Sequence, residues 1–533
     1  MQFPLRVFPS FLFGLALMTP AAMSQQAPTF KPITSETEAP AAEQTSPRSS
    51  MAEIETAWAE KNYVFVREGL RQHVEDTDQP LVQFRYGRVL LEALGGPRDL
   101  EGAVFWLEKS AAHKFVAAEN LLARLYLSAP QDGDLYQPER AIKLFSSAAA
   151  RGVAESQYYL GLVYRDGLSI EANLETAFNW LLAAAEQDHQ DAQLAVSRAY
   201  SRGEGVTKDT NMAVHWLTLA AENGHTSAQF NLARAYDEGR GVSLDRGQSL
   251  VWLQRAAEAG HVQSQRVLGR RYLIADDVAA NPSAAMTWLS TAAKRGDAEA
   301  MTLLGDAFGG GYGIAKDSEN AWAWYNQASN REYGRATAAI AGMLASGDGR
   351  PVDLEAALNT YRTALDQGYT PARIALGQLA GDGKLDGLVA PHTVVPWAFD
   401  AAAEGDTAAR DWLKQQADVG IRPAQTAWAI WLTEQGNTPE DAVPFFELAA
   451  QAGDVEAQFR LGQMLTRGDG GAQNYVQAHA WLNIAATGGH SKAAEVRSTV
   501  TDLMTAEEIA QAQTIARRFF EDAANQLPKG VSQ

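Results

Sequence analysis

The chain has 533 residues, 46% of them apolar and 20% charged, which is typical of a folded protein with several domains or one long array. Its formal net charge is −19, and it contains no cysteine. An acidic surface repels nucleic acid and anionic lipid, so neither is expected as a partner. The lack of cysteine excludes disulfides, thiol catalysis and cysteine-ligated metal.

The first 24 residues predict a secretory signal peptide. Arg6 is their only charged residue, the apolar run VFPSFLFGLALM follows at 7–18, and small residues precede position 25. An apolar run of this length is too short for a bilayer, which needs about 20 residues. Residues 25–50 contain four prolines and many Ser, Thr and Glu, so they predict a disordered linker. We therefore expect a periplasmic or secreted protein that is not an integral membrane protein.

The rest of the chain is periodic. Five tryptophans are separated by 36 residues each, and the same frame extends in both directions to Trp106, Leu144, Trp180, Trp216, Trp252, Trp288, Trp324, Thr360, Trp397, Phe445 and Trp481. A small residue stands 12 places after each of these positions, and most units have an aliphatic residue 16 places after. In one unit, Ala213, Trp216 and Leu217 share a helical face, and Gly224 ends that helix. Ala228 and Leu232 form the stripe of a second helix, so each unit is a helical hairpin that must stack on its neighbours.

A glycine-rich loop closes most units. The stretch YDEGRGVSLD (236–245) returns as YSRGEGVTKD (200–209), FGGGYGIAKD (308–317) and further variants. A glycine-rich loop can cradle a phosphate, but such a loop occurs once, after a buried strand, with Lys and Ser or Thr at fixed positions. This loop recurs and follows a helix. It is therefore predicted to be a turn, and no cofactor is expected.

The pattern AxxWLxxAAExGHxxAQxxLAxxYxxGxGVxxD, which residues 213–245 match almost throughout, resembles the Sel1-like repeat, a relative of the tetratricopeptide repeat. A degenerate copy, LVQFRYGRVLLEALGG, precedes the first complete unit at 81–96. The resemblance implies an all-α, right-handed α-solenoid of about 11–12 stacked hairpins whose helices line a concave groove. Members of this family generally act as adaptors. Exported bacterial members resemble scaffolds for envelope assembly, exopolysaccharide export or regulation, and host interaction.

The repeat pattern divides the chain into segments. We expect a signal peptide at 1–24, a linker at 25–50, an N-terminal degenerate repeat or cap at 51–105, regular repeats at 106–390, irregular and C-terminal repeats at 391–500, and a capping helix and tail at 501–533. Pro391 and Pro396 are expected to shorten the first helix of their unit. The stretch 405–445 is 12 residues too long, which indicates either a bend or a functional insertion. Thr505 and Glu508 predict a capped terminal helix.

No pattern for catalysis or metal binding is found. Nine residues after the frame position stand His189, His225, His261 and His490. Zinc ligands must lie near 2 Å from the metal, whereas equivalent positions of neighbouring units lie about 10 Å apart, so these histidines are interpreted as turn residues. No G-x-S-x-G or H-E-x-x-H motif is present, and neither an enzyme nor a metal site is expected. Four tryptophans outside the frame could form a sugar-binding platform, but burial is favoured: Trp322, Trp412, Trp428 and Trp431.

The first helix of each unit is predicted to carry recognition. Polar and variable residues stand one place before or two places after the frame position, and the candidates are Asn179, His215, Thr218, Gln254, Thr287, Ser290, Asn326, Asn359 and Arg362. Simple solvation explains them equally well. The predicted function is a noncatalytic adaptor of the bacterial cell envelope that binds a protein or peptide in the groove. The alternatives are an assembly or regulatory factor for exopolysaccharide synthesis or export, with polysaccharide-export components as partners, and an envelope hydrolase.

Overall fold

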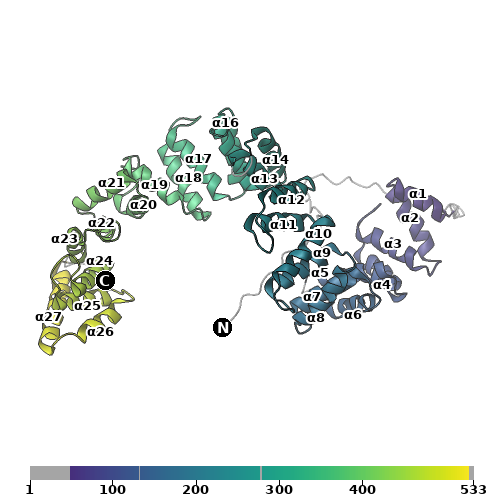
Figure 1. Cartoon of the computed structure of the whole chain (residues 1–533), viewed down its shortest axis with the longest axis horizontal. Coiled ribbons are helices and arrows are strands. Elements are labelled where there is room, and N and C mark those ends of the chain that lie inside the picture. Colours follow the sequence, from purple (N-terminus) through teal and green to yellow (C-terminus); the bar gives the residue numbers. More distant parts are fainter. Residues whose placement is uncertain (1–47, 131–132, 276–278, 527–533) are drawn as a thin grey trace, which may run out of the picture. The chain divides into compact units, whose positions relative to one another are not determined.

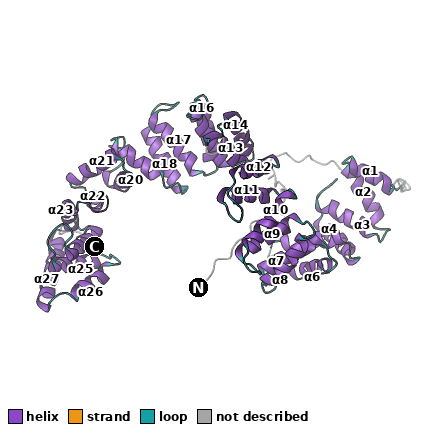
Figure 2. Cartoon of the chain, viewed as in Figure 1, coloured by secondary structure: helices purple, strands orange, loops and turns teal. Residues whose placement is uncertain are grey.

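The structure is a computed structural model of the chain, and it describes residues 48–130, 133–275 and 279–526 (Figure 1). These residues form 27 helices and no strand, as the all-α prediction requires (Figure 2). The predicted signal peptide and the linker up to residue 47 lie outside the described residues. The chain divides after Phe115 into two compact units, which are described separately. The other predicted segment boundaries stay predictions.

Unit 1 contains four helices, each packed on the next: α1 (Met51–Ala59), α2 (Tyr63–Val74), α3 (Pro80–Leu91) and α4 (Leu100–Ala112). The Ser50 hydroxyl and the Glu53 carboxylate form a capping box that starts α1. Ile54 is 1% exposed and packs against Gly69 of α2, where a Cβ atom would lie 2.7 Å from the Ile54 Cγ1. The close approach of α1 and α2 therefore depends on the missing side chain of Gly69.

Unit 2 alternates two kinds of helix. The A helices carry the frame position, and they are α6 (Pro138–Ala149), α8 (Leu174–Ala185), α10 (Thr210–Glu222), α12 (Arg246–Glu258), α14 (Pro282–Lys294), α16 (Ser318–Ser329), α18 (Leu354–Asp366), α20 (Pro391–Ala403), α23 (Pro439–Gln451) and α25 (Tyr475–Thr487). The B helices carry the small residue and the aliphatic residue, and they are α5 (Val116–Ser128), α7 (Ala154–Asp166), α9 (Gln190–Arg202), α11 (Thr226–Glu238), α13 (Val262–Ile274), α15 (Ala298–Gly309), α17 (Gly334–Ser346), α19 (Ala372–Gly381), α21 (Thr407–Asp418), α24 (Val455–Arg467) and α26 (Ala493–Thr501).

Substantial contacts in unit 2 join helices that are one or two places apart along the chain, which is the contact pattern of a solenoid. The core rows are those that the period predicts: Ala228 and Leu232 of α11 are fully buried, and Ala220 faces them from α10. In most units a small residue 17 places after the frame position lets the B helix approach the next A helix. At Gly161, for example, a Cβ atom would lie 2.7 Å from the Leu181 Cγ.

The recurring loop is a turn whose positions each have a structural role. Gly239 has φ 63° and ends α11 in the left-handed conformation. A Cβ atom at Gly241 would lie 2.6 Å from the Val214 Cγ2, so this glycine lets the loop pack on the preceding A helix. Asp245 then caps α12, because its carboxylate accepts a hydrogen bond of 2.9 Å from the Gln248 N–H. These roles explain the loop without a phosphate.

The region around Pro391 differs from the prediction. Helix α20 is not shortened: it runs over 13 residues, and Pro391 occupies a first-turn position where no backbone donor is needed. Pro396 lies inside the helix, which continues past it to Ala403 although the proline supplies no backbone donor. The predicted shortening was therefore wrong.

The surplus of the 405–445 stretch supplies an additional helix, α22 (Arg422–Glu434), between α21 and α23. Its buried residues Ala424, Trp428 and Leu432 repeat the four-residue spacing of a B helix. Two B-like helices, α21 and α22, therefore follow one A helix here. Whether the 405–445 stretch is a bend or a functional insertion therefore depends on the role of α22.

The chain's last described helix is α27 (Ala506–Gln526), which packs on α25. The Thr505 hydroxyl and the Glu508 carboxylate form the predicted cap, with the Thr505 N–H donating to Glu508 over 2.8 Å. Ala512 and Ala516 are the buried residues of its inner face, and Trp481 of α25 meets the Phe519 ring edge to face. The predicted terminal helix is thus present.

Candidate functional site: the exposed face of the A helices

All nine candidate residues lie on A helices, from α8 to α18. The residues one place before the frame position, which we call the outer row, are all exposed: Asn179, His215, Thr287 and Asn359. The residues two places after the frame position are half-buried except for Gln254, and these are Thr218, Ser290, Asn326 and Arg362. The two rows therefore differ in what they can offer to a partner.

Several of the candidates already have partners within the chain. The Gln254 amide donates to Glu258 over 2.9 Å, and the Asn326 amide donates to the Trp322 carbonyl over 2.9 Å. The Arg362 guanidinium lies 5.8 Å from the Trp397 ring centroid, so it packs against the next A helix. Arg362 thus contributes to stacking between units and Gln254 and Asn326 bond within their own helices, whereas the outer row is exposed to a partner.

The outer row is spread over four helices and does not converge on one point. None of the nine candidates lines either of two cavities of the described chain, which have volumes of about 510 and 360 Å³. A surface of this kind can bind an extended partner through many weak polar contacts, but it does not assemble a nucleophile with a base.

Three of the four predicted turn histidines, His189, His225 and His261, have a specific role, which is to cap the B helices α9, α11 and α13. The His225 Nδ1 accepts from the Ala228 N–H over 3.2 Å, and its Nε2 lies 3.1 Å from the Asp191 carboxylate of the preceding unit. A ring nitrogen that accepts a hydrogen bond carries no proton. The proton of the neutral ring is therefore on Nε2, which donates a hydrogen bond to the Asp191 carboxylate. This hydrogen bond lowers the pKa of Asp191 below its ordinary value. The turn interpretation agrees with this geometry, and the capping role was missed.

A buried glutamine row was also missed, although it recurs 13 residues after the frame position. In α11, the Gln229 side chain donates over 3.1 Å to the Ala221 carbonyl at the end of α10. The same bond is made in four other units by Gln157, Gln193, Gln265 and Gln458. Each adds a second hydrogen bond to a helix-end carbonyl that already accepts one from the backbone of the following turn. The recurring Ala-Gln pair in the sequence was the available signal.

The tryptophans outside the frame follow the burial interpretation in part. Trp412 is 7% exposed and Trp428 is 6% exposed. Trp431 is half-buried and stacks on Trp428, with ring centroids 5.0 Å apart. Trp322 is half-buried beneath the Arg350 guanidinium, which lies 4.0 Å from its ring centroid. Burial, which was favoured over a sugar-binding platform, is therefore seen most clearly at Trp412 and Trp428.

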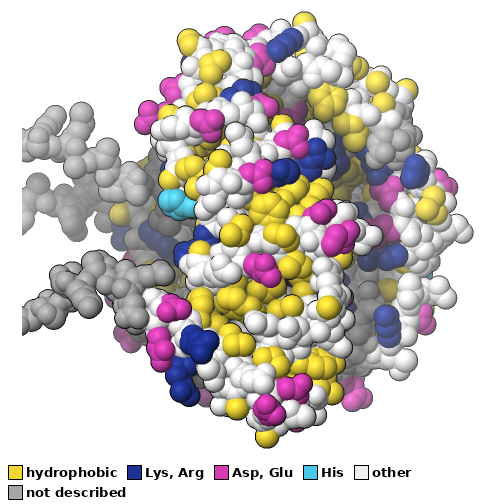
Figure 3. All heavy atoms as spheres, turned by 90° about the vertical axis from the view of Figure 1, so that its left-hand side faces the viewer, with side chains coloured by type: hydrophobic (Ala, Val, Ile, Leu, Met, Phe, Trp, Pro, Cys, Tyr) yellow, Lys and Arg dark blue, Asp and Glu magenta, His cyan; other side chains and the backbone are white. Residues whose placement is uncertain are grey.

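An apolar band is a further surface feature that the sequence did not indicate. Figure 3 looks onto the side where Figure 1 draws the C-terminal helices, and hydrophobic side chains gather there in a band bordered by charged ones. The C-terminal part of the chain contains several exposed large apolar side chains, namely Val419, Leu448, Leu503 and Phe520. Contiguous apolar surface of this kind marks interaction sites.

The stacked hairpins and the dispersed polar rows define an all-α repeat solenoid of the scaffold class. The family model for the Sel1 repeat matches eight segments, at 80–115, 116–153, 154–189, 190–225, 226–261, 262–297, 298–333 and 455–490. These segments cover more than half of the chain, and the protein belongs to the Sel1 repeat family. Sel1 repeats mediate protein interactions, and a solenoid of this kind is typically a noncatalytic scaffold.

A solved structure supports the fold. The chain resembles a protective antigen present in uropathogenic Escherichia coli strains that displays an SLR fold, with a TM-score of 0.54 and 25% identity over 87% of this chain and 98% of the other. A Sel1 repeat protein from Oxalobacter formigenes has 31% identity and a TM-score of 0.43, over 59% of this chain and 93% of the other.

Two curated proteins match short segments. The exopolysaccharide production negative regulator of Rhizobium meliloti is 45% identical over 56 residues, which are 10% of this chain and 21% of that protein. The chitin synthase regulatory factor 3 of Schizosaccharomyces pombe is 32% identical over 102 residues, which are 19% of this chain and 11% of that protein. The chain thus spans about a fifth or less of the length of these relatives.

In the part of the chain that the structure describes, none of the helices has both the length and the apolar character needed to cross a bilayer.

Proposed function

We propose that this protein is a noncatalytic adaptor of the bacterial cell envelope that binds a partner protein or peptide along the exposed face of its A helices. The observation that carries the proposal is the outer row. Four exposed polar residues of three types (Asn, His and Thr) stand at equivalent positions of α8, α10, α14 and α18, above core rows that hardly vary. A rigid scaffold with one variable polar face is suited to recognition by shape and hydrogen bonding.

The envelope location is part of the proposal. It rests on the signal-peptide pattern at 1–24, because such a segment directs export and is then removed. N-terminal sequencing of the protein purified from its native envelope fraction tests it. We expect a mature chain that begins at Gln25, and an intact N-terminus in the cytosolic fraction would contradict the location.

A second candidate is a regulatory factor for exopolysaccharide synthesis or export. The segment that is 45% identical to the Rhizobium meliloti regulator supports it. The partner would then be a synthase or export component that docks on the same face. The identity of the captured partner separates this candidate from a general envelope adaptor.

The test is a crosslinking pull-down from the native envelope with three forms of the chain. Wild type is compared with Asn179→Glu, Thr287→Glu and Asn359→Glu combined, because these outer-row residues are exposed and their replacement leaves the core intact. The matched control is Ser201→Glu, Gln263→Glu and Gln378→Glu combined, which adds the same charge on exposed positions of B helices.

We expect the outer-row variant to lose a partner that wild type and the control both capture, with at least a tenfold drop in recovery. Equal capture by all three forms would show that the outer row is not the docking face. If no form captures a protein and purified chain turns over an envelope substrate instead, the adaptor function is wrong and the hydrolase alternative stands.

A further inference from the structure

The loop between α19 and α20 departs from the regular two-glycine turn. Helix α19 ends at Gly381, and the chain then runs through successive turns, with the Lys384 N–H bonded to the Leu379 carbonyl over 2.9 Å and the Leu388 N–H bonded to the Leu385 carbonyl over 3.1 Å. Leu385 is 2% exposed and anchors this loop in the core. The loop is therefore built to a definite shape that the other units do not have.

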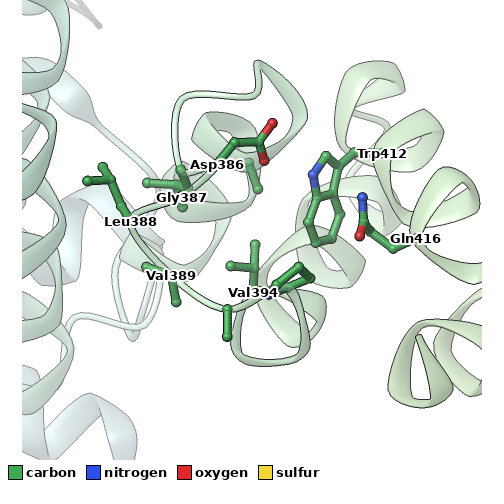
Figure 4. A pocket seen from close by; sticks show the side chains of 11 residues that line it. Asp386, Gly387, Leu388, Val389, Val394, Trp412 and Gln416 are labelled. Carbon is green, nitrogen blue, oxygen red and sulfur yellow. The ribbon is translucent and has the colours of Figure 1, made fainter. Parts of the chain in front are cut away.

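This loop forms one wall of a solvent-open cavity of about 510 Å³. The other walls are the start of α20, with Pro391 and Val394, and helix α21, with Trp412 and Gln416 (Figure 4). The volume falls within the range of about 300–1,000 Å³ that is usual for ligand pockets. Most of the lining residues are aliphatic, but polar atoms make up about half of the surface exposed in the cavity, so it suits a group with both apolar and polar parts.

Polar groups stand at three places around this lining. Trp412 is 7% exposed, and its indole Nε1 is buried and donates to no acceptor among the described residues. The nitrogen edge of the ring faces across the cavity toward Asp386 (Figure 4). Gln416 lines the cavity one turn further along α21. A buried donor without a partner is uncommon in folded proteins and points to an acceptor that the chain itself does not supply.

Asp386 gives the cavity its charge preference. Its side chain is exposed at the cavity, and no basic side chain of the described chain pairs with it, since the neighbouring Lys384 pairs with Asp382 over 2.9 Å. The chain as a whole has a net charge of −19. A phosphate or another anion is therefore disfavoured here, and a cationic group is favoured.

We propose that this cavity binds a short peptide segment of a partner protein in which an apolar residue stands next to Lys or Arg. A peptide carbonyl accepts from the Trp412 Nε1, and the Gln416 amide bonds the adjacent peptide group. The apolar side chain packs on Val389 and Val394, and the basic group pairs with Asp386. This inference rests on the proposed adaptor function and adds a second, sequence-reading contact outside the outer row.

The local test uses 19F NMR of the chain labelled with 5-fluorotryptophan. The probe is the capped hexapeptide Ala-Ala-Leu-Lys-Ala-Ala, and the comparison peptides carry Ser for Leu or Glu for Lys. Trp412→Phe assigns the Trp412 signal. Trp216 is the internal control, because its Nε1 is also buried and unpaired but it does not line this cavity. We expect the Trp412 signal alone to shift saturably, with at least tenfold weaker binding of either comparison peptide.

The variant test measures binding of the same labelled hexapeptides by fluorescence anisotropy. Asp386→Lys changes an exposed residue, so the fold is retained, and we expect at least tenfold weaker binding of the Leu-Lys peptide with a gain for the Leu-Glu peptide. Asp366→Lys is the matched control, because Asp366 is exposed at the end of α18 and does not line the cavity, and it should bind as wild type does. An unchanged affinity in Asp386→Lys, or no shift of the Trp412 signal by any peptide, overturns the proposal.

The outcome is separable from that of the adaptor function. If the peptides fail to bind while the envelope partner is still captured by wild type and lost by the outer-row variant, the cavity proposal falls and the adaptor stands. If Asp386→Lys abolishes capture and the outer-row variant does not, the cavity is the docking site and the proposed face is wrong.

Discussion

Six B helices begin with a side-chain cap, which is a histidine in α9, α11 and α13 and an aspartate in α15, α21 and α24. The His261 Nδ1 accepts from the Ser264 N–H over 3.3 Å, and the Asp297 carboxylate accepts from the Ala300 N–H over 2.7 Å at the equivalent position of the next unit. Both satisfy a donor that the helix start leaves open. Only the histidine cap depends on protonation near neutral pH, because the accepting nitrogen must remain free of a proton.

Acid should therefore weaken the histidine caps. Burial lowers the pKa of His261, so the folded chain favours the neutral ring. The stabilisation is complete above the unfolded pKa of about 6.5 and decreases as the pH falls below that value, because the unfolded state then binds more protons. We expect the urea midpoint of wild type to fall between pH 7 and pH 5, and His261→Asp to fall less over that range. Equal slopes for the two forms would contradict the capping role.

Three turn positions have a non-glycine residue where most units have glycine. Lys114, Asp188 and Glu332 have φ of 59°, 61° and 59°, so they adopt the left-handed conformation that Gly224 adopts at φ 94°. This conformation costs a residue with a side chain about 1–2 kcal/mol. Asp188 recovers some of this cost, because its carboxylate accepts hydrogen bonds from Gln193 and Asn223.

Glu332→Gly should stabilise the chain by about 0.5–1 kcal/mol, because glycine removes the backbone strain at some cost in entropy. Asp188→Gly should gain less, since it loses the two hydrogen bonds. Urea unfolding of both variants gives the free energies, with Glu332→Ala as the control that removes the charge and keeps the strain. A gain in Glu332→Ala as large as in Glu332→Gly would assign the effect to charge instead.

At the scale of helices, the contact between a B helix and the next A helix depends on a missing side chain. Gly377 of α19 faces α20, and a Cβ atom there would overlap the Trp397 carbonyl, which belongs to the backbone and cannot rotate away. At Gly342 of α17 a Cβ atom would meet only the Tyr361 hydroxyl, at 3.4 Å. Gly342 therefore has room for a side chain, whereas Gly377 does not.

Gly377→Ala should destabilise the chain by about 2 kcal/mol or more, because α19 and α20 must move apart. Gly342→Ala should stabilise it by up to about 1 kcal/mol, since alanine favours the helix and meets no backbone. Thermal and urea unfolding of both single variants measure the difference. The packing account is wrong if Gly377→Ala is neutral.

The period predicted the hairpins, the buried stripes and the turns, because each of these depends on residues within one unit. Ala228 and Leu232 are buried, and Gly239 ends α11, as the spacing indicated. Contacts between units were not predictable in this way. Arg362 packs on Trp397, 35 residues away, and the sequence alone did not show that this side chain faces a neighbouring unit while the outer row faces solvent. The shape of the loop at 382–390 and its cavity also depend on such contacts.

At the scale of the whole molecule, each repeat unit contacts mainly the units next to it along the chain. We therefore expect that one complete unit can be deleted from the array. Deletion of 226–261 joins His225 to Val262, which reproduces the existing junction of His261 with Val262. Helix α10 then meets α13, whose buried residues Ser264, Gln265 and Leu268 stand where Ala228, Gln229 and Leu232 stood. The new interface has the same layout as the one removed.

We expect the 226–261 deletion to remain folded and monodisperse, with a thermal midpoint within about 5 °C of wild type, because stability in a repeat array is close to a sum of units and their interfaces. The deletion 226–255 is the control: it breaks the 36-residue register, joins a turn to the end of α12, and should unfold or aggregate. Circular dichroism and size-exclusion chromatography compare the two. If the 226–261 deletion also unfolds or aggregates, the stability of the array depends on contacts beyond adjacent units. A mutation in one unit would then change the stability of distant units as well.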